Sequence, residues 1–105
     1  MGRTRMKPLC QAFGIGATII LPSSSNGGDL NALNENGIYC WGPGGAPSNA
    51  PFNRGAVIHM RISGDGAEAV QLAFSSKATN TKLVQVRWKY SASNVWDSWQ
   101  SIAVT

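Results

Sequence analysis

The chain has 105 residues, of which 43% are hydrophobic and only 13% are charged, against about 25% charged in an average domain. This length suffices for one domain, and low charge with ample hydrophobicity excludes a disordered tail. Arg3, Arg5 and Lys7 carry three charges of the net +4, so the remainder is nearly neutral, with no basic stripe for a nucleic acid.

Residues 1–28 are predicted to be a connector. A basic start and a mostly apolar run from Pro8 to Leu21 are similar to the first regions of a signal peptide. Gln11 and two glycines interrupt that run, however, and it is too short to span a bilayer as a helix. We therefore favour a connector over a secretion signal, and we expect no membrane insertion. Residues 17–21 have the β-branched content of a short strand.

The domain itself is predicted to span residues 29–105. It begins with one helical turn over 29–33, with Asp29 as its N-cap. Residues 34–37 are expected to form a turn in which Gly37 supplies a positive φ. A strand over 37–41 comes next, and then a long loop over 42–56 that holds three prolines and four glycines. Loops of this length inside a small domain are often functional.

Four further strands are expected over 57–63, 70–74, 82–90 and 95–104. Apolar and polar residues alternate along the first three, so that one face of each strand is apolar. We expect these residues to point into the core: Ile58, Met60, Ile62, Val70, Leu72, Phe74, Val84, Val86, Trp88 and Tyr90. The polar face would carry His59, Arg61, Gln85, Arg87 and Lys89. The fold class is therefore mainly β, a small antiparallel sheet or sandwich with one short helical turn near the start.

The residues favour no catalysis. His59 is the single histidine, and a lone histidine on a strand is more often structural than catalytic. Asp29 is a cap and Asp65 lies in a turn, which leaves no evident carboxylate pair for glycoside cleavage. Cys10 and Cys40 lack partners at metal-ligand spacing and are expected to be reduced thiols. We predict no enzyme, no metal and no cofactor.

Four tryptophans provide the most informative chemistry, because flat indole faces stack on sugars as well as filling cores. Trp88 is expected in the core. In a regular strand Trp96 and Trp99 would lie on opposite faces, so that only one of them is core. Trp41 borders the long loop and is the best candidate for exposure.

An ordered set of motifs runs through the domain. Asp29-Leu30-Asn31-x-Leu33 precedes Gly37-Ile38-Tyr39 and Asn49-x-Pro51, and Gln71, Arg87 and Trp96-x-x-Trp99 follow at later strands. In order and spacing this set resembles the C-terminal knob module of phage tail fibres and R-type pyocin fibres, over about residues 12–103.

The resemblance implies a homotrimeric fibre of the virion, made in the bacterial host cytoplasm, whose tip binds lipopolysaccharide or capsule without cleaving it. It also implies that the motif residues are scaffold: Asn31, Gly37, Tyr39, Asn49, Pro51, Gln71, Arg87, Trp96 and Trp99. Recognition would then lie in loops. The ligand-binding residues we predict are Trp41, Asn49, Asn53 and Arg54.

Two alternatives stay open. The domain could be a structural or trimerisation module of the fibre, with recognition elsewhere, because low charge and a large apolar share suit a buried intersubunit face. A cellular carbohydrate-binding accessory domain would rest on the same physics.

Overall fold

A computed structural model describes residues 17–42, 44–76, 83–90 and 95–103 of the chain. Their strands are β1 (Ile19–Ile20), β2 (Gly37–Trp41), β3 (Gly55–Arg61), β4 (Glu68–Ser75), β5 (Val84–Tyr90) and β6 (Gln100–Ser101). Two 3₁₀ turns, η1 (Ser24–Asn26) and η2 (Leu30–Ala32), lie between β1 and β2. The strands form one six-stranded sheet in chain order, in which β1 is parallel to β2 and all other neighbours are antiparallel. The predicted mainly β class is confirmed.

Most predicted elements occur with small changes of length. The strand over 37–41 is confirmed at its full extent, and the predicted helical turn is η2, where the Asp29 side chain accepts from Asn31 N at 2.9 Å. Gly37 does not have the positive φ expected of it. The last strand is much shorter than predicted, because residues 97–99 leave the sheet between a bridge at Trp96 and the start of β6.

Part of the predicted connector is joined to the sheet. β1 pairs with β2, Leu21 N donates to Cys40 O at 2.7 Å, and Gly28 and Ser48 are linked by a backbone hydrogen bond of 2.8 Å. Residues 1–16, including Cys10, lie outside the described residues. Among the described residues, neither short helix approaches the length or apolar character that a membrane-spanning helix needs.

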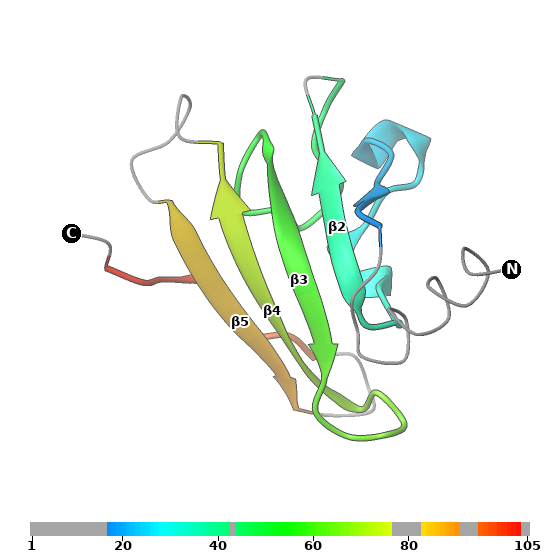
Figure 1. Cartoon of the computed structure of the whole chain (residues 1–105), viewed down its shortest axis with the longest axis vertical. Coiled ribbons are helices and arrows are strands. Elements are labelled where there is room, and N and C mark those ends of the chain that lie inside the picture. Colours follow the sequence, from blue (N-terminus) through cyan, green and yellow to red (C-terminus); the bar gives the residue numbers. More distant parts are fainter. Residues whose placement is uncertain (1–16, 43, 77–82, 91–94, 104–105) are drawn as a thin grey trace, which may run out of the picture.

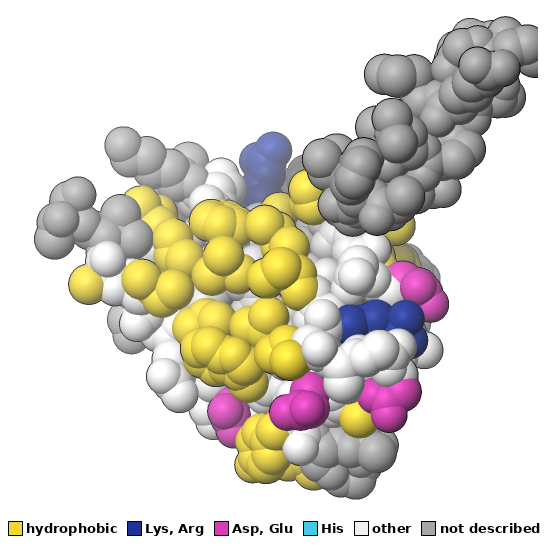
Figure 2. All heavy atoms as spheres, turned by 60° about the horizontal axis from the view of Figure 1, so that its bottom comes forward, with side chains coloured by type: hydrophobic (Ala, Val, Ile, Leu, Met, Phe, Trp, Pro, Cys, Tyr) yellow, Lys and Arg dark blue, Asp and Glu magenta, His cyan; other side chains and the backbone are white. Residues whose placement is uncertain are grey.

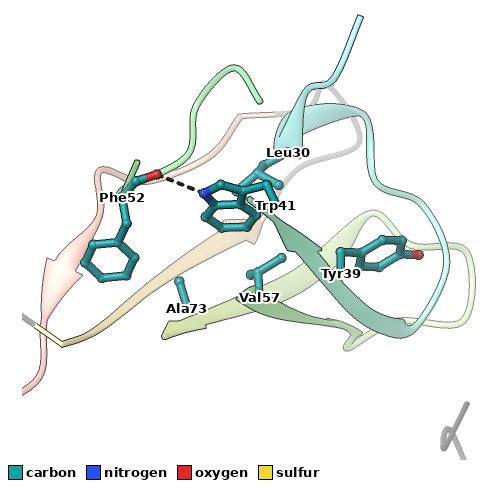
Figure 3. Packing of buried hydrophobic residues seen from close by; sticks show 6 residues of the cluster. All are labelled: Leu30, Tyr39, Trp41, Phe52, Val57 and Ala73. Carbon is teal, nitrogen blue, oxygen red and sulfur yellow. Dashed lines mark hydrogen bonds between the residues drawn. The ribbon is translucent and has the colours of Figure 1, made fainter. Parts of the chain in front are cut away.

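Both η2 and the long loop before β3 pack on one face of the sheet, which we call the covered face. Its hydrophobic cluster consists of Leu30, Tyr39, Trp41, Phe52, Val57 and Ala73 (Figure 3). Trp41 is 3% exposed and donates its indole Nε1–H to Phe52 O at 3.0 Å, which folds the long loop back over the strands. The expectation that Trp41 is exposed is therefore wrong.

The opposite face, which we call the open face, carries the alternating apolar residues. In Figure 1 the near face of β2 to β5 is clear of other described segments. Met60, Phe74, Trp88 and Tyr90 are all exposed. The polar residues that alternate with them along the strands are buried instead, among them His59 and Arg87.

The prediction that the apolar side of the alternation points into the core is thus wrong, and so is the placement of Trp88 in the core. Alternation identifies which residues share a face but not which face other segments cover. Burial of the polar side is tolerable because its side chains bond to one another, as buried polar groups must.

Candidate functional site

A row of polar side chains crosses the covered face. His59, Gln71 and Arg87 occupy one register position on β3, β4 and β5, and all three are buried. Gln71 Nε2 donates to Leu30 O at 2.8 Å and to His59 Nδ1 at 3.1 Å, while Gln71 Oε1 accepts from Arg87 Nε at 2.9 Å. Gln71 therefore links η2 to three strands, and every polar atom of its amide has a partner.

This arrangement fixes the charge state of His59. A ring nitrogen that accepts from an amide carries no proton, so Nδ1 is bare and the imidazole is neutral. Burial, together with the positive charges of Lys89, Arg61 and Arg87, lowers the pKa of His59 to about 4. His59 is a structural acceptor at neutral pH.

The stability of the domain is expected to fall as His59 becomes protonated. The folded pKa lies below the ordinary value of 6.5. His59 therefore makes its full contribution to the stability of the folded state above pH 6.5. That contribution is lost progressively as the pH falls toward 4, and no further loss from His59 occurs below that pH. The loss amounts to about 3 kcal/mol in the free energy of unfolding. Urea unfolding at pH 7 and pH 5 should show about 2 kcal/mol of this loss.

His59→Gln supplies the control, because it keeps a polar side chain and removes the titrating group. The difference between the wild type and this variant isolates His59 from other groups such as Asp65, whose pKa is lowered by hydrogen bonds from Ala67 N and Ser63. A wild type with the same pH dependence as His59→Gln would contradict the assignment.

Arg87 is held between two indoles. Its guanidinium carbon lies 4.4 Å from the ring centre of Trp96 and 4.7 Å from that of Trp99, within the range of cation–π contacts. Burial lowers the pKa of Arg87 to about 10, against which the charge of Asp29 acts, so the group stays charged at neutral pH. The expectation that Trp96 and Trp99 lie on opposite faces is wrong, because the segment between them is not a regular strand.

Asn49 ties the long loop to this cluster. It adopts a left-handed φ of 65°, which asparagine tolerates better than most residues. Its Nδ2 donates to Asp29 Oδ1 at 2.8 Å, and its carbonyl oxygen accepts from Trp99 Nε1 at 2.8 Å. One residue thus joins the cap of η2 to the closing segment.

A pocket of about 490 Å³ opens beside this cluster. Its lining residues are Asn31, Asn49, Ala50, Arg87, Val95, Trp96, Asp97, Ser98 and Trp99. Asn49, Val95 and Ser98 are exposed and form its rim, whereas Arg87 is buried in its wall.

Three buried polar atoms of the lining residues have no hydrogen-bond partner within the described part of the chain. They are Asn31 Oδ1, Arg87 Nη2 and Trp96 Nε1, one acceptor and two donors. Unpaired buried polar atoms are uncommon and costly, and all three belong to residues that line this pocket. Because each atom has almost no exposed surface, a ligand that offers both donors and acceptors would satisfy them only after a movement that exposes them.

The acid–base groups of the pocket are few. Asp97 is the only carboxylate among its lining residues, whereas glycoside cleavage generally uses two carboxylates. Across residues 17–42, 44–76, 83–90 and 95–103, no three His, Cys, Asp or Glu side chains come close enough to hold a metal ion.

The four predicted ligand-binding residues lie in different parts of the structure. Asn49 is at the pocket rim, Asn53 and Arg54 are exposed but do not line the pocket, and Trp41 is buried. Arg87 and the segment Trp96–Trp99 also line the pocket, whereas the family resemblance implied that Arg87, Trp96 and Trp99 are scaffold. The available signal was an arginine on a strand together with Trp-x-x-Trp. This pattern brings both indoles to the arginine only if the backbone between the two tryptophans is irregular.

Comparisons with models of protein families, with curated proteins and with solved structures gave no match to the chain.

Proposed function

We propose that the chain is the receptor-binding tip of a phage or prophage tail fibre, and that it binds a bacterial surface glycan without cleaving it. Lipopolysaccharide or capsule is the class of receptor. The observation that carries the proposal is the pocket beside Arg87, where two indoles lie next to amide, carboxylate and hydroxyl side chains. Sugars present apolar faces that suit indoles and hydroxyls that suit such polar groups.

The unpaired atoms favour a hydroxylated ligand over an anion. A sugar hydroxyl both donates and accepts, so neighbouring hydroxyls can satisfy Arg87 Nη2, Trp96 Nε1 and Asn31 Oδ1 together. An anion would satisfy only the two donors, and it would share the pocket with the carboxylate of Asp97. Since the three atoms have almost no exposed surface, binding involves a small movement of the pocket wall.

The fibre assignment rests on the ordered motif set, and part of that set meets in one network. Residues far apart in the chain meet in one network: Asn31, Asn49, Gln71, Arg87, Trp96 and Trp99. Such a network can hold the residues of a pocket in place even in a small domain. In a trimeric fibre on the virion, three weak pockets would combine into avid attachment to a cell.

The alternative is a structural or trimerisation module of the fibre, with recognition elsewhere. The open face favours it, because such a large apolar surface suits contact between subunits. The two functions are compatible in one chain, since the pocket and the open face lie on opposite sides of the sheet.

An array of purified bacterial lipopolysaccharides and capsules tests the binding function. We expect the wild type to bind at least one of them, and Ser98→Trp, which fills the pocket from its exposed rim, to weaken binding by at least about tenfold. Ser24→Trp places the same side chain at an exposed position of η1 away from the pocket and should bind normally. Failure of the folded wild type to bind any of these glycans, or release of cleaved saccharide, would contradict the proposal.

A further inference from the structure

The open face is a continuous apolar layer over four strands. The register places Ile38, Ile58, Leu72 and Val86 opposite one another on β2 to β5. Partners in a sheet point to the same side, so these four side chains form one row. Met60, Val70 and Trp88 form the next row. Figure 2 shows hydrophobic side chains gathered into such a broad patch on the surface of the molecule.

The side chains of this face are exposed to an unusual degree. Trp88 is 41%, Phe74 41% and Tyr90 60% exposed. If a whole aromatic side chain covers about 150–250 Å², these three alone expose roughly 200–350 Å². Met60 at 44% and Ile62 at 57% add to this. The largest apolar patch of a typical monomer is about 300–600 Å², so the open face falls within this range, in which patches often mark interaction sites.

The face is also almost free of charge. Among its positions on β2 to β5, Glu68 at one end of β4 is the only charged residue. The remaining positions hold Ile38, Cys40, Ala56, Ile58, Met60, Val70, Leu72, Phe74, Val84, Val86, Trp88 and Tyr90. Ile20, which pairs with Cys40 and is 78% exposed, extends the layer onto β1. A surface without charge does not select a partner of opposite charge. A second copy of the same surface complements it, because both are apolar and neither brings a charge into the contact.

We propose that the open face is the surface through which copies of this chain associate, each covering the open face of another. An apolar sheet face is stable when a second layer buries it, and two such faces pack about 10 Å apart with interlocking side chains. Pairing the open face with an equal face would bury about 600–1,200 Å² in total, which reaches the lower end of the range for specific interfaces. The pockets beside Arg87, on the other side of each sheet, would remain open to solvent.

Light scattering coupled to size-exclusion chromatography tests the proposal on the full chain at micromolar concentrations. We expect a wild-type mass of two or more copies, and a mass of one copy for Met60→Lys and for Tyr90→Lys. An unpaired lysine buried in the interface should weaken association by at least about 100-fold. Both side chains are already 44% and 60% exposed in the single chain, so the fold should survive both substitutions, which circular dichroism checks.

Ile19→Lys is the matched control. Ile19 is 49% exposed and neighbours Ile20 on β1, but it pairs with Tyr39 and therefore belongs to the opposite side of the sheet. It should keep the wild-type mass. A monomeric wild type, or an oligomer that persists in both Met60→Lys and Tyr90→Lys, would overturn the proposal. The mass measured by light scattering does not depend on glycan binding, so this test and the glycan array can fail independently.

Discussion

Gln71→Leu is expected to destabilise the domain by about 3 kcal/mol or more. Gln71 is completely buried, and its amide satisfies Leu30 O, His59 Nδ1 and Arg87 Nε at once. Leucine fills a similar volume but leaves these partners buried and unpaired, at about 1–3 kcal/mol each. Against a total stability of about 5–15 kcal/mol for a domain, this is a large fraction. Urea unfolding at pH 7 measures it.

Gln85→Leu is the control for this substitution. Gln85 lies on the neighbouring strand β5, is only partly buried, and belongs to the same side of the sheet, opposite Ala73. The identical chemical change there should alter stability by less than about 1 kcal/mol. Equal effects at the two positions would show that Gln71 is not the centre of the network.

Arg87→Met is expected to cost about 2 kcal/mol of stability and to abolish glycan binding. Methionine retains much of the packing volume but loses the contacts with the Trp96 and Trp99 rings, each worth about 0.5–2 kcal/mol. It also leaves Gln71 Oε1 without its donor. Relief from burying a charge offsets part of the loss. The two indoles would then lose the group that both contact, and the pocket that they line would change shape.

Thermal unfolding and the glycan array together check this result. Arg54→Met applies the same change to an exposed arginine of the long loop and should stay within about 0.5 kcal/mol of the wild type. A fully stable Arg87→Met variant that still bound glycan would show that the arginine and its two indoles form neither a structural nor a functional unit.

The sequence predicted the strands well because alternation is a local property. β2 was found at its full extent, and β3 to β5 were found within a few residues. The side of the sheet that is covered depends on where the loops pack, and that depends on long-range contacts such as the hydrogen bond from Trp41 to Phe52. The usual rule that apolar residues point inward therefore gave the wrong side for Trp88 and Met60.

The candidate pocket was predicted less well, for a related reason. Asn49 was identified, but Trp41 was chosen for its position beside a loop, and that loop turned out to bury it. Trp96 and Trp99 were judged by strand periodicity, whereas the chain bends between them so that both reach Arg87. A pocket formed by contacts across distant segments leaves little trace in local sequence.

Nuclear magnetic resonance of the four indole N–H groups tests the central claim, that glycan binds in the pocket beside Arg87. The chain would be titrated with oligosaccharide released from the lipopolysaccharide or capsule that it binds on the array. We expect the Trp96 and Trp99 signals to shift in a saturable way, while those of Trp41, in the core, and Trp88, on the open face, stay in place. Saturable shifts at Trp88 with no change at Trp96 and Trp99 would place the glycan on the opposite side of the sheet and contradict the account.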